Sequence, residues 1–145
     1  MLTTDRNRTN LHRLNERINR GDLSIVDELV SKDYVLHTAT GVEMGLDAYR
    51  KNLAAIFQIY PDFKITIESV VAEEDLVAHY FRWEGTYRGE SGGRDIAGKR
   101  VTVRAMAISR FDDGKIVEEW TLHDRLGLYQ QLGIVPSDRE LSGNR

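Results

Sequence analysis

The hydrophobic periodicity of the chain changes at Pro61, and this change limits the possible folds more than any other feature. Before Pro61, apolar side chains recur every three or four residues, most clearly over residues 46–60. After Pro61, apolar and polar residues alternate, first over residues 63–68. A spacing of three to four is typical of an amphipathic helix, and alternation is typical of a strand with one buried face. The chain is therefore expected to form helices first and a sheet afterwards.

The same patterns locate the individual elements. Helices are expected over residues 9–20, 22–30, 46–60 and 124–132, and strands over residues 34–38, 63–68, 77–84, 100–111 and 116–122. This order predicts an α+β domain, in which a curved antiparallel sheet carries the N-terminal helices on one face and encloses a pocket between the two layers. Residues 1–135 are expected to form this single domain, and residues 136–145 a frayed polar tail.

The composition excludes several classes of protein. The chain has 145 residues, and its 20 basic and 23 acidic residues provide no excess of positive charge for binding nucleic acid. It has no cysteine, which removes disulfides and thiolate chemistry. The longest apolar run, residues 53–57, is far shorter than a membrane-spanning helix, and the N-terminus shows no export signal. We therefore expect a cytoplasmic protein that binds neither nucleic acid nor membranes.

The four histidines, at positions 12, 37, 79 and 123, are candidate acid/base groups. Their spacing fits no metal-binding motif, so neither a metal nor a cofactor is expected. His79 shares the apolar face of its strand with Val77, Phe81 and Trp83. It is either a hydrogen-bonded core residue or a proton carrier in the pocket. His37 ends a strand just before a turn, which places it at the mouth of the pocket.

The end of the last expected strand is the densest group of polar residues near the core. Strand alternation places Glu119, Thr121 and His123 on one face and Trp120 on the other. Asp124 follows, and it either caps the closing helix or acts as an acid/base group with a pKa raised by an apolar pocket.

Two segments near the C-terminal end carry a resemblance to a known family. Residues 113–120 (DGKIVEEW) and 126–133 (LGLYQQLG) resemble the closing strand and helix of the SnoaL-like polyketide cyclases, which belong to the nuclear transport factor 2-like superfamily. Residues 19–22 and 33–37 are similar to the helix–helix–strand opening of this family, and residues 85–89 to one of its strand ends. The resemblance covers residues 10–133 and implies a cone-shaped α+β fold with a deep cavity.

The resemblance implies a cofactor-independent enzyme. The best-known members close the last ring of an aromatic polyketide by intramolecular aldol condensation, in which an acid/base residue removes a proton and the resulting enolate attacks a carbonyl. In these cyclases the acid/base aspartate directly follows the position of Trp120, where this chain has Thr121. Threonine does not transfer protons near neutral pH. Proton transfer is therefore expected to depend on His79, with His37 and Asp124 as partners, or to be absent.

These observations predict a general acid/base enzyme that acts on a hydrophobic, carbonyl-bearing small molecule, by aldol-type cyclisation or a related isomerisation or dehydration. The residues expected to bind the substrate are Thr121, Trp83, Trp120, His123 and Phe57. The alternative is a small-molecule-binding domain of the same fold without catalysis, which the threonine at position 121 favours. Another chemistry in the same cavity, such as addition of water to an epoxide, requires Glu119 to face the cavity.

An open sheet leaves an outer face for association, and members of the resembled family commonly pair through it. Tyr80, opposite His79 on its strand, fits such a contact, whereas Arg82 and Glu84 on the same face weaken it. A homodimer is expected.

Overall fold

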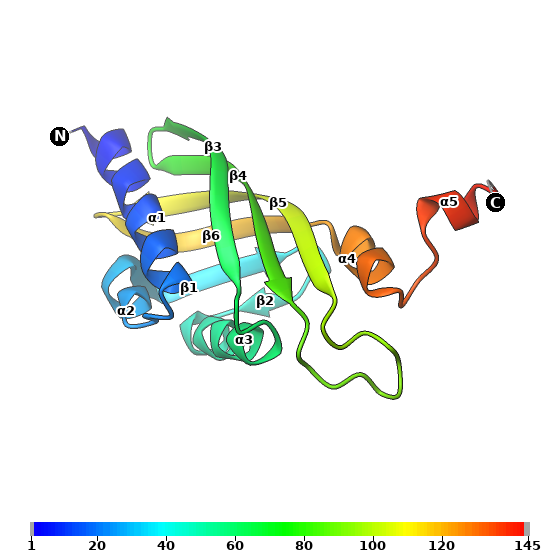
Figure 1. The fold of residues 1–145 in the computed structure, drawn as a ribbon. Coiled ribbons are helices and arrows are strands. Elements are labelled where there is room, and N and C mark those ends of the chain that lie inside the picture. The colour runs from blue at the N-terminus through cyan, green and yellow to red at the C-terminus, as the bar shows by residue number, and fades with distance from the viewer. Residues whose placement is uncertain (1, 144–145) are drawn as a thin grey trace.

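The computed structural model describes residues 2–143, which form five helices and six strands (Figure 1). The helices are α1 (Thr3–Asn19), α2 (Ile25–Leu29), α3 (Leu46–Ile59), α4 (Arg125–Leu132) and α5 (Asp138–Leu141). The strands are β1 (Val30–Thr38), β2 (Glu43–Met44), β3 (Lys64–Glu73), β4 (Leu76–Thr86), β5 (Arg100–Asp112) and β6 (Lys115–His123). Within residues 2–143, no helix combines the length and apolar character needed to cross a membrane.

The six strands form one sheet in the order β2-β1-β6-β5-β4-β3. The expected α+β fold is confirmed, but the expectation of a wholly antiparallel sheet is wrong at one pairing, because β1 and β6 run parallel. The other four pairings are antiparallel. β3 and β4, and likewise β5 and β6, are joined by tight turns, which require antiparallel neighbours, whereas β4 and β5 are joined by the longer loop of residues 87–99. β1 and β6 are joined only through α3 and the rest of the sheet, so no local turn signal indicates their relative direction.

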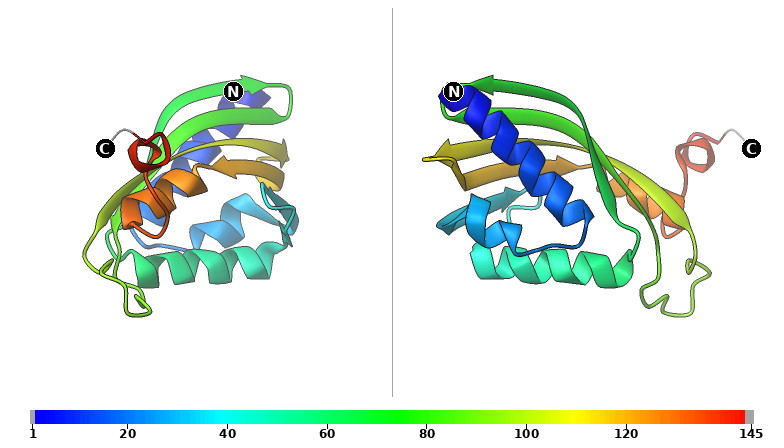
Figure 2. Two further views of the ribbon diagram at one scale, coloured as in Figure 1. Left: turned by 90° about the vertical axis from the view of Figure 1, so that its right-hand side faces the viewer. Right: turned by 60° about the vertical axis from the view of Figure 1, so that its left-hand side comes forward.

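The sheet curves around α1, α2 and α3, which lie together on one side of it (Figure 2). α1 packs across β3 and β4, and α3 packs against β1. Every second residue of β4 and β5 is buried beneath these helices, so the alternation in the sequence defines an inner face toward the helices and an outer face.

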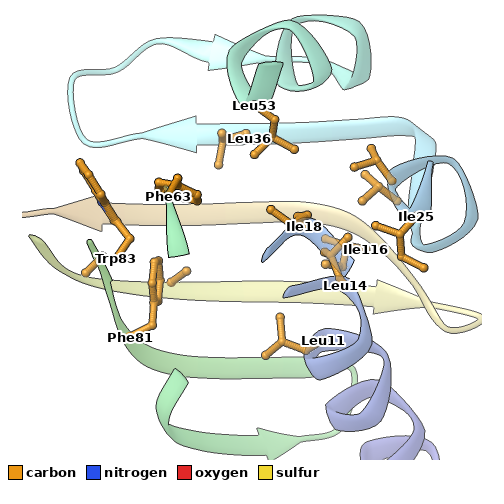
Figure 3. Close-up of a cluster of buried hydrophobic side chains, with 14 of the residues drawn as sticks. Leu11, Leu14, Ile18, Ile25, Leu36, Leu53, Phe63, Phe81, Trp83 and Ile116 are labelled. Carbon is orange, nitrogen blue, oxygen red and sulfur yellow. The ribbon is translucent and has the colours of Figure 1, made fainter. Parts of the chain in front are cut away.

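The hydrophobic core lies between the helices and the inner face of the sheet (Figure 3). Leu11, Leu14 and Ile18 form the buried stripe of α1 and are each at most 4% exposed. They meet side chains from α2, α3 and the strands, among them Ile25, Leu36, Leu53, Phe63, Phe81, Trp83 and Ile116. Burial of one such side chain contributes about 1.5–3 kcal/mol. One cluster therefore holds both layers together.

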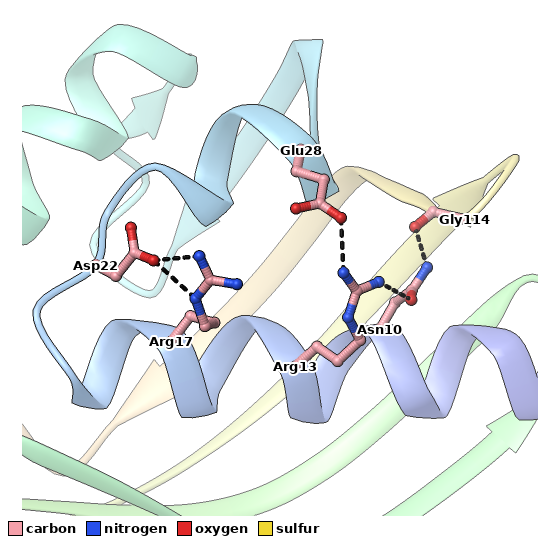
Figure 4. Close-up of polar contacts among 6 residues, drawn as sticks. All are labelled: Asn10, Arg13, Arg17, Asp22, Glu28 and Gly114. Carbon is pink, nitrogen blue, oxygen red and sulfur yellow. Dashed lines mark hydrogen bonds and ion pairs between the residues drawn. The ribbon is translucent and has the colours of Figure 1, made fainter.

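Polar contacts orient α1 against its neighbours (Figure 4). The Asn10 amide donates a hydrogen bond of 2.8 Å to the Gly114 carbonyl in the β5–β6 turn. Arg13 pairs with Glu28 of α2 at 2.6 Å, and Arg17 pairs with Asp22. Because the charged groups are partly exposed, these pairs contribute little free energy. They align α1 with α2 and with the β5–β6 turn.

Several boundaries differ from the expected ones, and β3 continues to Glu73 rather than ending at residue 68. α1 begins at Thr3 rather than residue 9, and its added turns bury Asn7. Val30, expected in the second helix, begins β1, because it pairs with Ile116 and is buried there. Residues 138–141, expected in a frayed tail, form the short helix α5, whose capping box joins Ser137 and Glu140. For residues 144–145, which lie outside the described range, the frayed tail stays a prediction.

Candidate active site in the cavity between sheet and helices

A cavity of about 340 Å³ lies between the inner face of the sheet and helices α1, α3 and α4. Most of its wall is apolar and comes from Leu11, Leu14, Leu36, Leu53, Ile56, Tyr60, Phe63, Ile65, Phe81, Trp83, Val103, Ala107 and Leu128. Its polar lining residues are Asn15, Tyr49, Asn52, His79, Glu119, Thr121, His123, Arg125 and Tyr129. A few polar groups in an apolar hollow of this size are typical of a small-molecule site.

Two alanines of β5 leave room for the cavity at the middle of the sheet. Ala107 lies between His79 of β4 and Thr121 of β6 in the strand register. Ala105 lies in the same way between Phe81 and His123. Since neighbouring strands are about 4.8 Å apart, the backbones of His79 and Thr121 are roughly 10 Å apart across a strip of small side chains. The floor of the cavity between His79 and Thr121 is therefore a small side chain.

His79 combines burial with an unpaired nitrogen. It is 7% exposed, and its ring stacks on Phe81 with 4.9 Å between the ring centroids. Its Nδ1 atom has no hydrogen-bond partner among the described residues. Burial lowers the pKa of His79 to about 4, and the charge of His12 adds to this effect. The imidazole is therefore neutral near pH 7 and a weaker base than a solvated histidine, and its catalytic role stays a prediction.

Three of the predicted substrate-binding residues, Trp83, Thr121 and His123, line the cavity. Trp83 packs edge-on against Tyr60 at 5.2 Å. His123 meets Phe81 edge-on at 5.8 Å. Burial lowers the pKa of His123, and Arg125 lowers it further. The cavity therefore has a second imidazole, which is exposed at its rim and lies on the same face of β6 as Thr121.

Glu119 belongs to the cavity wall but not to the predicted catalytic set. Its Oε1 atom accepts a hydrogen bond of 3.0 Å from the Tyr34 hydroxyl, and its Oε2 atom accepts one of 2.5 Å from the Ser109 hydroxyl. Burial raises the pKa of Glu119, while the hydrogen bonds from Ser109 and Tyr34 oppose this rise. Strand alternation places Glu119 on the same face as Thr121, and this alternation is the sequence feature that could have identified Glu119 as a site residue. The hydroxyl groups that hold its carboxyl belong to β1 and β5, and the sequence around Glu119 does not indicate them.

His37 and Trp120 do not lie in the cavity, contrary to expectation. Both belong to the outer face of the sheet, where their rings stack with 5.4 Å between centroids. His37 Nε2 lies 2.8 Å from Glu118, and Nδ1 lies 3.2 Å from Glu43. The alternation of β1 explains this correction, because Leu36 faces the cavity and its neighbour His37 must face outward.

Asp124 and Phe57 also lie outside the cavity. Asp124 is the N-cap residue of α4, and its carboxylate accepts a hydrogen bond of 2.9 Å from the backbone N–H of Gly127. Of the two roles expected for Asp124, a helix cap or an acid/base group, this contact is that of a helix cap. Phe57 packs edge-on against Phe63 at 5.5 Å, and only Phe63 reaches the cavity.

Replacing Asp124 by alanine should lower the free energy of unfolding by about 1 kcal/mol, the usual cost of losing an N-cap. Asp124→Asn keeps a capping oxygen and should remain near the wild-type value. Urea unfolding of the three proteins measures the difference. If asparagine is as destabilising as alanine, the charge of Asp124 matters rather than its capping bond.

The curved sheet, the covering helices and the cavity between them define a domain of the nuclear transport factor 2-like fold. Within this class, the chain belongs to the SnoaL-like polyketide cyclase family, whose model matches residues 9–132. A search of curated proteins finds no match.

Solved structures agree with this assignment. IdmH, a candidate polyketide cyclase from Streptomyces antibioticus, is 29% identical, with a TM-score of 0.80 over 88% of this chain and 98% of that chain. AclR, a candidate hydroxylase from Streptomyces galilaeus, is 28% identical, with a TM-score of 0.82 over 92% of this chain and 99% of that chain. A candidate SnoaL-like polyketide cyclase from Jannaschia Sp. CCS1 is 19% identical and shares the fold, with a TM-score of 0.80 over 94% of this chain and 97% of that chain.

Proposed function

We propose that this protein is a cofactor-independent acid/base enzyme that acts on a hydrophobic, carbonyl-bearing small molecule. The observation that carries the proposal is the position of His79, which lines an apolar cavity with its Nδ1 atom buried in the wall, so that the other ring nitrogen is the one that meets a ligand. A buried polar atom without a partner costs about 1–3 kcal/mol. An apolar side chain at this position would avoid this cost.

The proposed chemistry follows from a neutral imidazole in an apolar cavity. His79 takes a proton from a carbon between two carbonyl groups, and the electron pair of the broken C–H bond forms an enolate. The enolate carbon attacks a second carbonyl of the same molecule and forms a C–C bond. The imidazolium then returns its proton to the resulting alkoxide. A carbon between two carbonyls is already acidic, so the cavity contributes mainly orientation and charge stabilisation.

Thr121 supports the second candidate, a ligand-binding domain without catalysis. If position 121 is where the cyclases of this family carry their acid/base aspartate, this chain has lost that group. AclR, which has the same fold, is described as a candidate hydroxylase rather than a cyclase. Binding and turnover must therefore be measured separately.

The test is deuterium exchange at the carbon between the carbonyls of 2-acetyl-1-tetralone, a bicyclic 1,3-diketone, followed by proton NMR in D₂O. The enzyme proposal predicts exchange clearly faster than in buffer, together with saturable binding in calorimetry. Binding with exchange at the buffer rate favours the non-catalytic domain. The absence of both binding and exchange contradicts both candidates.

We further propose that two copies of the chain associate through the outer face of the sheet. Four large side chains of β5 and β6 are exposed there: Met106 by 59%, Ile108 by 43%, Trp120 by 39% and Leu122 by 64%. Met106 is paired with Leu122, and Ile108 with Trp120, so the four form one apolar patch. Such a patch is typical of an interaction site. A second copy offers the same patch in a two-fold arrangement.

The substitution Leu122→Glu should convert the dimer to a monomer, because it places a charge at the centre of the patch. Light scattering after size-exclusion chromatography at micromolar concentration measures the mass. Val42→Glu, at a residue that is 52% exposed beside the β1–β2 turn, is the matched control and should leave the dimer intact. A wild-type protein that remains a monomer at these concentrations contradicts the proposal.

A further inference from the structure

The hydrogen-bonded carboxyl of Glu119 has no role in the proton transfers described above. Both of its oxygens are held by hydroxyl groups, Oε1 by Tyr34 and Oε2 by Ser109. Tyr34 is 2% exposed and Ser109 is fully buried, so the two hydroxyls lie behind the cavity wall and Glu119 forms part of the wall itself. This arrangement fixes the carboxyl in place at the cavity wall.

The three residues come from three different strands. Ser109 and Glu119 are paired directly between β5 and β6, and Leu36, two residues after Tyr34, pairs with Glu119 between β1 and β6. Tyr49 of α3 completes the surroundings, with its ring 5.1 Å from that of Tyr34. Glu119 is half-buried, and carboxyls removed from water are usually paired. Here the partners are hydroxyls rather than a cation.

Nothing in the packing requires an acidic residue at this position. In the described part of the chain, the carboxyl of Glu119 bonds only to the hydroxyls of Tyr34 and Ser109 and forms no ion pair. Burial raises the pKa of Glu119, and it also raises the pKa values of Tyr34 and Tyr49. A carboxyl in such surroundings is suited to hold and release a proton.

We infer that Glu119 is a second catalytic residue, which donates a proton to the carbonyl oxygen of the substrate and recovers it later. This inference rests on the proposed function and adds a substrate requirement, namely a carbonyl oxygen that reaches the wall formed by β6. As His79 removes the proton from carbon, Glu119 gives its proton to the oxygen that gains the electron pair, so that an enol forms. The enol carbon then bonds to the second carbonyl, the enol proton returns to Glu119, and the imidazolium protonates the new alkoxide.

The hydroxyl partners explain how the carboxyl carries the negative charge between these two steps. Once Glu119 has released its proton, Tyr34 and Ser109 each donate a hydrogen bond to one carboxylate oxygen. Hydrogen bonds to an ionised acceptor are about twice as strong as those between neutral groups. The same two contacts therefore stabilise the intermediate more than the resting state. Tyr34 and Ser109 are positioning residues in this scheme.

The substitution Glu119→Gln tests the inference, because glutamine keeps the shape and can still hydrogen-bond but cannot transfer a proton. Its matched control is Glu118→Gln, at the neighbouring position of β6, where the carboxylate lies on the outer face beside His37 and Arg110. Deuterium exchange of 2-acetyl-1-tetralone is compared for both variants and the wild type. Calorimetric binding of the same compound shows whether the cavity is intact.

Glu119→Gln should slow the exchange by about 100-fold or more, the usual contribution of a general acid, while the Kd for the diketone changes by less than about threefold. Glu118→Gln should behave as the wild type. If Glu119→Gln exchanges at the wild-type rate while removal of His79 abolishes exchange, Glu119 is structural, and only this inference is wrong. If the wild type itself exchanges no faster than buffer, the proposed function fails, and the inference fails with it.

Discussion

Replacing His79 by leucine is expected to abolish catalysed exchange and, at the same time, to stabilise the folded protein at pH 7. Loss of the general base should slow the exchange by at least about 100-fold. Leucine fills similar space in the apolar cavity wall and removes an Nδ1 atom that has no partner among the described residues. The free energy of unfolding should therefore rise by about 1 kcal/mol. Opposite effects on activity and stability are typical of a residue retained for function.

Urea unfolding and the exchange assay, applied to the same samples, measure both effects. His37→Leu is the matched control, since His37 lies on the outer face and is paired with Glu118 and Glu43. The His37→Leu protein should catalyse deuterium exchange at the wild-type rate. If His79→Leu keeps its exchange activity and loses stability, His79 is an ordinary core histidine and the assignment is wrong.

The free energy of unfolding should fall by about 3 kcal/mol between pH 7 and pH 4 because of His79 alone. The pKa of His79 is about 4 in the folded protein, whereas the ordinary value, which applies to the unfolded chain, is 6.5. As the pH falls below 6.5, the unfolded chain binds a proton at this position that the folded protein does not bind. Acid therefore favours unfolding through the whole interval from about pH 6.5 to pH 4.

The measurement is the difference between wild type and His79→Leu in urea unfolding at several pH values. Glu119 acts in the opposite direction, because a carboxyl with a raised pKa favours folding as the pH falls, but it is present in both proteins and cancels in the difference. Near neutral pH, the free energies of unfolding of the two proteins should differ by a constant amount. Toward pH 4, this difference should grow. Parallel curves would mean that His79 titrates alike in both states.

The fold was predictable because its signals are local. The helical stripe before Pro61, the alternation after it and the Asp112–Lys115 turn each depend on neighbouring residues, and each corresponds to an element of the structure. The parallel pairing of β1 with β6 and the two-residue strand β2 depend on contacts between distant segments. No periodicity in a single segment indicates such contacts.

The candidate site was predictable only where the alternation of one strand was enough. On β4 and β6, alternation placed His79, Trp83, Thr121 and His123 toward the cavity, and the structure shows all four there. His37 was placed at the pocket mouth because it ends its strand, and the alternation with Leu36, which directs His37 outward, was not applied. For Glu119 the face was available from the sequence, but its importance depends on hydroxyls from two other strands, which become neighbours only in the folded sheet.

The most direct test of the central claim is an NMR titration of the His79 imidazole with and without 2-acetyl-1-tetralone. Selective ¹⁵N labelling of histidine, with His79→Leu for assignment, follows the ring from pH 8 to pH 4. The account predicts a ring that stays neutral to about pH 5 and whose nitrogen signals shift when the diketone binds. A ring that titrates near its ordinary value of 6.5 and does not respond to the bound compound would contradict an acid/base site in this cavity.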